Sequence, residues 1–422
     1  MTSIHSFVEN LKGDKTIWAI ITLLAIFSFL PVYSASSNLV YVYGRGNTFS
    51  YLLKHLSHLI VGFCFVFFIH RLPYLLFRIA SKVLLGLMIP LLAYTLLQGT
   101  TIGGANASRW LNIFGMSFQP STMAFLVLMI YVARHLAKYY GKEISFQQSL
   151  LRLWMPVLIV VMLVLPANFS TAALIFLMVL VLVFISGYPI KYLAQVVGIG
   201  AGALTLFITL ALAFPDAMPN RVQTWKSRIE NFTSAETEAA NEDENYQVEK
   251  AKMAIATGGI TGLGPGKSLQ KNFLPQSSSD FIFAIIVEEY GLFMACLLVF
   301  LYMLLLIRFI MQAGKSPTVF GRLLILGLGL PIIAQALINM CVAVNLLPVT
   351  GQTLPLISSG GTSIWMTCIA LGVILSVTNR EEVLPILENE SDLPSENDTY
   401  SIEDTQSQDS KINPLTVVQN QS

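Results

Sequence analysis

The sequence is short of charge. Of its 422 residues only 12% are Asp, Glu, Lys or Arg, while 55% are hydrophobic and the mean hydropathy is +0.67. Soluble globular domains carry about 25% charged residues. This shortage excludes a soluble enzyme, a disordered regulator and a nucleic-acid-binding protein with a basic face. The 25 basic and 24 acidic residues nearly cancel, so their positions are more informative than their sum.

Cysteine and histidine are scarce as well, with four and five residues. The cysteines lie inside apolar runs and form no close motif, so we expect small apolar side chains and neither disulfides nor a zinc framework. His55 and His58 share a helix face but have no evident third ligand. We therefore expect no metal site and interpret the two histidines as an interfacial pair.

Long apolar runs dominate the chain. A membrane-spanning helix needs about 20 mostly apolar residues. That window predicts about ten spans, at 17–35, 55–70, 79–98, 119–136, 153–167, 171–188, 191–214, 281–311, 322–346 and 360–379. The predicted fold class is all-α, a polytopic membrane protein with a long extracytoplasmic loop, 215–280, between helices 7 and 8.

The basic residues orient this arrangement. With both termini in the cytoplasm, 15 of the 25 Lys and Arg lie in inner segments. Three (Arg45, Lys54 and Arg109) lie in short outer loops, and the rest lie in the long loop, which is exempt from the positive-inside rule. The bias predicts a cytoplasmic N-terminus at 1–16, a membrane domain at 17–380 and a cytoplasmic tail at 381–422. Because the tail holds ten acids and little to bury, we expect it to be disordered.

The long loop ends in a glycine-rich turn, 258–268, that closes with Gly-Lys-Ser. A P-loop is excluded, because Thr261 stands where its first glycine is required and no strand precedes it. Two interpretations stay open: a plain flexible turn, or a cradle of backbone N–H groups and lysines (Lys267 and Lys271) for a phosphate.

Carboxylates gather where the next span begins. Asp280 follows three serines, and it is interpreted either as a helix N-cap or as a general base at the membrane surface. Glu288 and Glu289 follow about two turns into the helix. For these, a structural hydrogen bond to a neighbouring helix and a direct role both stay open.

Two further outer segments are polar. Arg109 and Trp110 predict an interface anchor, and the planar guanidinium also suits a diphosphate. The last loop, 345–363, is rich in Pro, Gly and hydroxyl groups, which at membrane depth indicates a polar cavity. Gln335 and Asn339 lie at i and i+4 of the preceding helix, so both amides are expected to face this loop.

In this order, these motifs resemble the FtsW/RodA (SEDS) family of bacterial membrane glycosyltransferases, which polymerise the peptidoglycan precursor lipid II. The resemblance covers essentially the whole membrane domain. It rests on Arg109-Trp110 with Gln119-Pro120-Ser121, Tyr246-Gln247, Gly262-Leu263-Gly264, Phe273-Leu274-Pro275, Asp280-Phe281-Ile282-Phe283-Ala284, Glu288-Glu289, Gln335, Asn339, Leu347-Pro348-Val349-Thr350-Gly351, Leu354-Pro355 and Ser358-Ser359-Gly360-Gly361.

The chain departs from the family pattern in places. The family usually has Glu and Lys where Thr122 and Phe125 stand, and Asp where Asn168 stands. The stretch 351–355 favours the division type, because the elongation type tends to have proline at the position of Thr353. An elongation role is the alternative.

The resemblance implies glycosyl transfer between lipid-linked disaccharides, with Asp280 as the base. Arg109, Lys267 and Lys271 are implied as diphosphate ligands, in that order. Trp110, Gln335, Asn339, Thr350 and Ser358 complete the expected substrate site. No cofactor is expected, although a divalent cation can accompany the diphosphate.

The resemblance also implies partners and a place in the cell. The expected partners are lipid II, a single-span class B penicillin-binding protein and other division proteins, at the septal cytoplasmic membrane. The competing functions are a lipid II flippase, which would tolerate loss of Asp280, and a non-catalytic division scaffold.

Overall fold

The computed structural model describes residues 11–43, 48–99, 109–113, 116–142, 144–213, 242–274 and 277–379. The predicted tail at 381–422 and residues 215–241 and 275–276 of the long loop lie outside these ranges. Asn379, the last described residue, begins a second compact unit, and everything below concerns the first unit, which ends at Thr378.

The described chain is almost entirely helical, as predicted. In order, the elements are α2 (Lys15–Tyr43), α3 (Thr48–Ile69), α4 (Leu75–Gln98), β1 (Leu111–Ile113), β2 (Met116–Phe118), α5 (Pro120–Lys138), α6 (Phe146–Ser149), the π-helix η1 (Leu150–Trp154), α7 (Met155–Val164), α8 (Phe169–Ile185), α9 (Ile190–Ala213), α11 (Glu242–Gly258), the 3₁₀ turn η3 (Gln270–Asn272), α12 (Ile282–Lys315), α13 (Val319–Ala343) and α14 (Gly361–Thr378).

The described helices agree with about ten spans. Eight segments are long and apolar enough to cross a membrane, with α6, η1 and α7 together making one of them. The shorter apolar helices Phe169–Ile185 and Ile190–Leu206 bring the count to ten. Several spans begin earlier than hydropathy alone predicts; α3, for example, starts at Thr48 rather than at residue 55. The chain is a multi-pass membrane protein.

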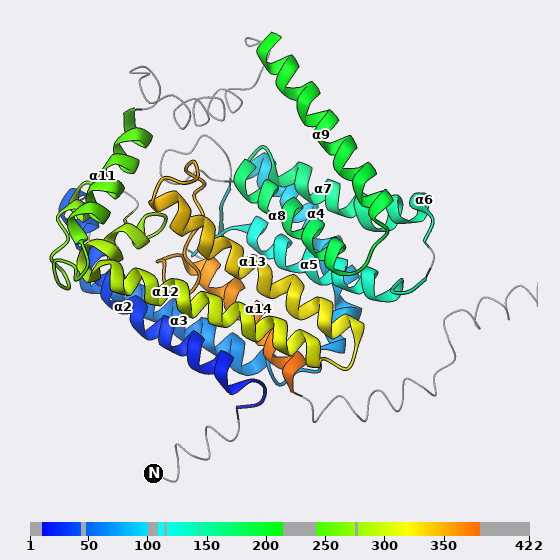
Figure 1. Ribbon diagram of the computed structural model, residues 1–422, viewed down its shortest axis with the longest axis horizontal. Coiled ribbons are helices and arrows are strands. Elements are labelled where there is room, and N and C mark those ends of the chain that lie inside the picture. The colour runs from blue at the N-terminus through cyan, green and yellow to red at the C-terminus, as the bar shows by residue number, and fades with distance from the viewer. Residues whose placement is uncertain are drawn as a thin grey trace, which may run out of the picture. The chain divides into compact units, whose positions relative to one another are not determined.

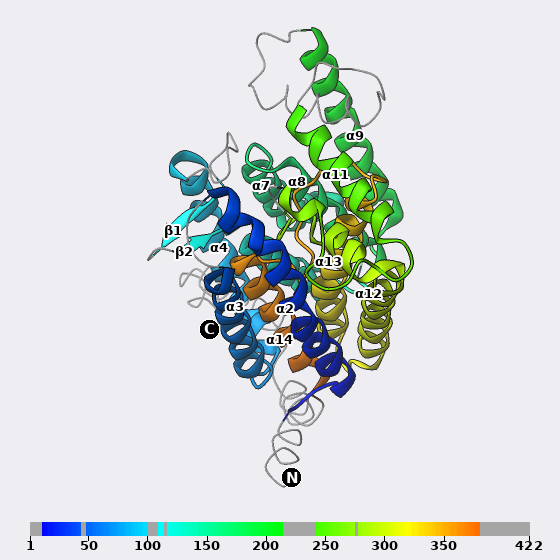
Figure 2. The same ribbon diagram turned by 90° about the vertical axis from the view of Figure 1, so that its left-hand side faces the viewer.

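Helix α13 lies at the centre of the helical unit. It packs against α5, α8, α12 and α14 (Figure 1), and 72% of its apolar window is buried, against 22% for α3 and α4. Helices α2, α3 and α14 run side by side (Figure 2). Side chains of α3 and α4 that point away from this packing form the lipid-facing surface. This explains why these two helices are apolar on all sides.

The two ends of the helical unit meet. The backbone N–H of Asp14, before α2, donates to Thr378 Oγ1 at the end of α14, at 3.0 Å. The Asp14 carboxylate accepts from the N–H groups of Thr16 and Ile17 at 2.7 and 2.9 Å and lies 3.8 Å from Arg308. Both ends of the unit therefore lie on one side, as an even number of spans requires.

Two elements at the other end were not predicted. Strands β1 and β2 form an antiparallel hairpin in which Leu111 pairs with Phe118. Helix α11 occupies part of the long loop and packs against α12. Three-residue strands are too short for a detectable alternation, and α11 is too polar for a search for apolar runs to find it.

Candidate functional site

The turn before α12, residues 277–281, is held by hydrogen bonds that its backbone carbonyl groups accept. The carbonyl oxygen of residue 278 accepts from Ser359 N–H at 2.8 Å, and that of residue 279 accepts from Ser358 Oγ at 2.6 Å. The carbonyl oxygen of Asp280 accepts from Asn339 Nδ2 at 2.8 Å. Three successive carbonyls are thus bound by the last loop and α13. We call residues 277–281 the Asp280 turn.

Asp280 lies one residue before the N-cap position of α12. The helix begins at Ile282, and Phe281, whose side chain cannot cap, stands in the N-cap position. The cap interpretation of Asp280 stays a prediction. The half-buried Asp280 side chain lies against the last loop, where a Cβ placed on Gly351 would be 3.6 Å from its Oδ2 atom.

Hydrogen bonds connect this turn to the region of Arg109. Asn339 Nδ2 also donates to the carbonyl oxygen of Gln352 at 2.7 Å, and Gln352 Nε2 donates to Thr171 Oγ1 at 3.0 Å. The N–H of Thr171 is capped by Asn168 Oδ1 at 3.2 Å. Next to Asn168, the carbonyl of residue 167 accepts from Arg109 Nε. The network thus extends from the predicted base to the first-ranked diphosphate ligand.

Asn339 and Ser358 therefore hold the Asp280 turn rather than standing apart from it. Both side chains are buried, with 1% and 2% of their surface exposed. Ser358 Oγ also accepts from the N–H of Leu354 at 2.7 Å, so it links the last loop to the turn. That Asn339 and Ser358 bind substrate stays a prediction. The contacts of both side chains are those of residues that position the turn.

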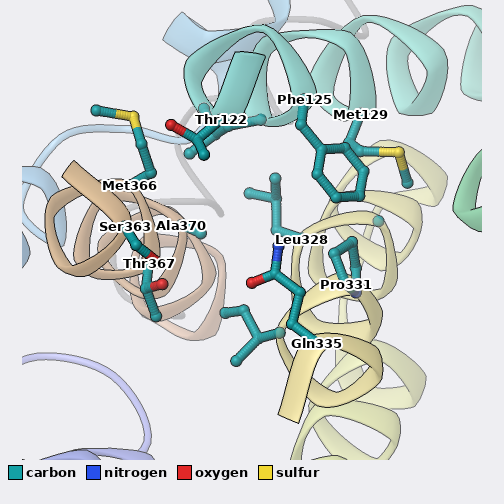
Figure 3. Close-up of a pocket in the computed structure, with 13 residues that line it drawn as sticks. Thr122, Phe125, Met129, Leu328, Pro331, Gln335, Ser363, Met366, Thr367 and Ala370 are labelled. Atoms are coloured by element: carbon teal, nitrogen blue, oxygen red, sulfur yellow. The ribbon is translucent and has the colours of Figure 1, made fainter. Parts of the chain in front are cut away.

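Gln335 does not join Asn339. It faces a cavity of about 50 Å³ between α5, α13 and α14, where its amide projects toward side chains of α14 (Figure 3). Thr122 and Phe125 line the same cavity. That volume has room for a few water-sized groups and no lipid tail. Asn339 bonds the last loop directly, whereas Gln335 shares its cavity with Ser363, the last residue of that segment.

Three backbone N–H groups of the glycine-rich turn bind carbonyl groups of the protein and are not free for a phosphate. The N–H groups of Leu263 and Gly264 donate at 2.9 Å to the carbonyls of Glu288 and Glu289, and the N–H of Gly262 donates to Gly258 O at 2.8 Å. Because these donors are used within the protein, they do not point at a ligand. Two of these bonds join the turn to α12, so it is more than a plain connection.

The remaining predicted residues lie in different settings. Lys267 is exposed on the glycine-rich turn, while the Lys271 ammonium donates to Gly266 O at 2.7 Å and to Ser34 Oγ at 3.2 Å. Trp110 is half-buried before the β hairpin. Thr350 Oγ1 is buried without a hydrogen-bond partner among the described residues. The role of Thr350 as a substrate ligand stays a prediction.

Glu288 and Glu289 are fully buried, and both accept hydrogen bonds, as the structural interpretation requires, although Glu289 does so through Oε1 alone and its Oε2 atom has no partner among the described residues. His55 is buried, and its Nε2 lies 2.8 Å from Ser28 Oγ. Within the described ranges there is no group of three His, Cys, Asp or Glu side chains placed to hold a metal ion. All four cysteines are free.

Comparison with known proteins decides the family. The family model described as "Cell cycle protein" and named for FtsW, RodA and SpoVE matches residues 14–383. The chain belongs to this FtsW/RodA/SpoVE family. The match spans every element of the site, from the start of α2 to the last loop and α14.

Individual relatives agree. A probable peptidoglycan glycosyltransferase FtsW from Coxiella burnetii is 30% identical over 376 residues, which is 86% of this chain and 96% of the relative. The stage V sporulation protein E of Bacillus subtilis is 30% identical over 377 residues, covering 88% and 98%.

Solved structures share the fold. The rod shape determining protein RodA of Thermus thermophilus has a TM-score of 0.62 at 25% identity, covering 88% of this chain and 98% of its own. A chain of a peptidoglycan synthase complex has a TM-score of 0.68 at 24% identity, covering 88% and 99%.

The departures from the family pattern have local explanations. Asn168 accepts the capping bond of α8 with its amide oxygen, so a carboxylate is not needed there. Thr122 Oγ1 donates to Gln119 O at 2.8 Å in the first turn of α5. Phe125 is buried and lines the α5–α13–α14 cavity. An apolar ring and a self-satisfied hydroxyl therefore occupy the two positions where the family usually carries charge.

Sequence reasoning missed Thr171, Gln352 and Ser34. Thr171 follows Asn168 at the i+3 spacing of a capped helix start, which was a detectable signal. Gln352 was seen as part of a motif but not as a link between helices. Nothing in the sequence around Ser34, inside an apolar span, indicates that it contacts a loop 237 residues away.

Gly351→Ala tests the fit around Asp280. Gly351 has φ = +66°, a conformation that costs other residues about 1–2 kcal/mol. The backbone strain of an alanine there falls beside the Asp280 carboxylate, which a new Cβ would meet at 3.6 Å. We expect the polymerisation rate to fall at least tenfold while the protein still folds. Gly360→Ala, which meets only ordinary contacts at 3.5 Å, is the control. Equal rates for the two variants would contradict the role given to this contact.

Proposed function

We propose that this protein is a peptidoglycan glycosyltransferase that polymerises lipid II at the outer face of the membrane, with Asp280 as the general base. Family membership supports the reaction class. The observation that carries the assignment of the base is the Asp280 turn, in which three consecutive carbonyls are bound. General-base catalysis needs a group held within about 3 Å of the proton it removes. The bonds to the carbonyls of residues 278–280 fix the backbone that carries the Asp280 carboxylate.

The reaction is a substitution at the anomeric carbon of the donor. The 4-hydroxyl oxygen of one lipid-linked disaccharide forms a bond to that carbon, and its proton passes to the Asp280 carboxylate. The bond from the same carbon to the diphosphate breaks, and undecaprenyl diphosphate leaves with both electrons. Negative charge grows on the diphosphate, so nearby cations stabilise the transition state. Arg109 and Lys267 are assigned to that role.

The experiment is reconstitution of the purified chain in liposomes with fluorescent lipid II, with and without a cognate class B penicillin-binding protein. We expect glycan polymer on gels, in larger amounts when the partner is present. Lipid II that crosses the bilayer without forming polymer would instead establish the flippase. Binding of division proteins with neither reaction would establish the scaffold.

Arg109→Ala tests the diphosphate assignment. Hydrogen bonds to charged groups contribute about 1.5–3 kcal/mol, so we expect about a tenfold or greater rise in the lipid II concentration that gives half-maximal rate. Arg109→Lys keeps the charge but loses the Nε–H bond to the residue 167 carbonyl. Its half-maximal lipid II concentration should lie between those of the wild type and Arg109→Ala. An unchanged dependence on lipid II concentration would contradict the assignment.

The partner and the location belong to the same proposal. The solved complex that shares this fold is described as coordinating polymerisation and crosslinking, which supports a transpeptidase partner for this chain. The excess of basic residues on one side supports cytoplasmic termini. Relatives named FtsW support a division role at the septum, for which septal localisation of a fluorescent fusion is the direct test.

A further inference from the structure

Two adjacent carboxylates are buried in α12. Glu288 and Glu289 have 0% and 1% of their surface exposed, within a helix that crosses the membrane domain. Buried charges need hydrogen bonds and a partner of opposite sign, because desolvation of an unpaired ion costs several kcal/mol. The contacts of this pair therefore indicate what it does.

Glu288 binds the start of the η3 turn. Its Oε1 atom accepts from the N–H groups of Leu269 and Gln270 at 3.0 and 3.2 Å, and from Thr257 Oγ1 at 3.5 Å. Its Oε2 atom accepts from Ser268 Oγ. With donors on both oxygens, one side chain of α12 fixes the loop around residues 268–270.

Glu289 binds helix α2 and, through it, a lysine. Its Oε1 atom accepts from Ser34 Oγ and from the N–H of Ser268 at 3.3 Å. Because Ser34 gives its proton to Glu289, the hydroxyl accepts from the Lys271 ammonium, which lies 3.2 Å away. One hydroxyl group thus connects the cation and the anion.

The cluster joins three segments near the Asp280 turn. Lys271 reaches Ser34, and Ser277 Oγ lies 3.4 Å from the carbonyl oxygen of the next residue of α2, Ala35. The loop before the Asp280 turn therefore contacts Ser34 of α2, and the turn itself contacts the next residue of the same helix, Ala35. Adjacent residues of α2 thus hold both the loop and the Asp280 turn.

We propose that Lys271 is the counter-ion of the Glu288–Glu289 pair, through Ser34, and that these four residues position the outer loop and the Asp280 turn. The proposal gives Lys271 a role other than the diphosphate ligand that the resemblance implies, and it rests on the proposed function for its effect on rate. The four are positioning residues. Lys267, exposed on the same loop, keeps the role of a diphosphate ligand.

A double-mutant cycle separates the two roles of Lys271. We expect Lys271→Met to lower the maximal rate about tenfold, without raising the lipid II concentration at half-maximal rate, and to have little further effect in a Glu289→Gln background. Lys267→Met combined with Glu289→Gln is the control, whose effects should multiply. Multiplying effects for Lys271, or a raised half-maximal concentration, would overturn the proposal.

Hydrogen exchange of the full-length protein tests the cluster without any activity. Glu288→Ala should increase exchange at residues 263–264 and 268–270 at least tenfold, while Glu288→Gln, which keeps an oxygen at the Oε1 position, should preserve protection. If Glu288→Ala does not fold, Ser34→Ala replaces it, with Ser37→Ala on the same helix as control. Wild-type exchange in Glu288→Ala, or in its replacement Ser34→Ala, would overturn the proposal. Absence of polymer from the wild type would count against the proposed function alone.

Discussion

Asp280→Asn is expected to lower the rate of glycan polymerisation by at least a hundredfold. General-base catalysis contributes about 10²–10⁴ in rate, and an asparagine amide cannot take up the proton of the attacking hydroxyl. The substitution keeps the size of the side chain and leaves the bonds from Ser358, Ser359 and Asn339 untouched, because all of these reach backbone carbonyls. The measurement is the initial rate on labelled lipid II with the partner present.

The same variant should fold and bind substrate normally. Its melting temperature in detergent and its affinity for lipid II should match the wild type, which distinguishes a lost base from a lost site. Glycan synthesis by Asp280→Asn at near the wild-type rate would remove Asp280 from the mechanism. It would also favour the flippase, for which this carboxylate has no chemical task.

Gly291→Ala is expected to produce the largest loss of stability. Helix α12 is broken at Gly291, which has φ = 73° and ψ = −176°, a conformation almost restricted to glycine that costs other residues about 1–3 kcal/mol. A Cβ there would stand 2.2 Å from Ile260 O, so the glycine-rich turn must move as well. Overpacking of this kind adds about 1–3 kcal/mol. The expected total is about 3 kcal/mol in the free energy of unfolding.

The measurement is thermal unfolding of the detergent-solubilised variant. Gly314→Ala lies in the same helix, has open space around its Cβ position and should be neutral or slightly stabilising, since alanine favours helix by up to about 1 kcal/mol. A melting temperature of Gly291→Ala equal to that of Gly314→Ala would show that the turn and the helix break are not interlocked.

The membrane fold was predictable because each span can be recognised from the hydropathy of its own residues, without knowledge of its neighbours. The lengths of the apolar runs located the helices. The basic residues predicted that both ends of the membrane domain lie on one side, and the contact between Asp14 and Thr378 agrees with this. The break at Gly291 was not predictable, because a single glycine inside a helical pattern is tolerated and does not by itself indicate a break. It depends on residues 259–264, whose hydrogen bonds replace those missing from the helix.

The site was predictable as a set of residues but not as a set of roles. Asp280, Asn339 and Ser358 were all selected, yet only the structure shows that the last two bind the backbone beside the first. Lys271 and Lys267 are equivalent in the sequence, and they differ because Ser34, far away in the chain, meets only one of them. Long-range pairings of this kind leave no local pattern.

The most direct test of the account is a cryo-EM structure of the Asp280→Asn protein with lipid II bound in both the donor and the acceptor positions. We predict that the acceptor 4-hydroxyl lies within about 3.2 Å of the residue 280 side chain, the distance that proton transfer requires, and that the donor diphosphate lies beside Arg109. An acceptor hydroxyl that faces another group and leaves residue 280 out of reach would contradict the account.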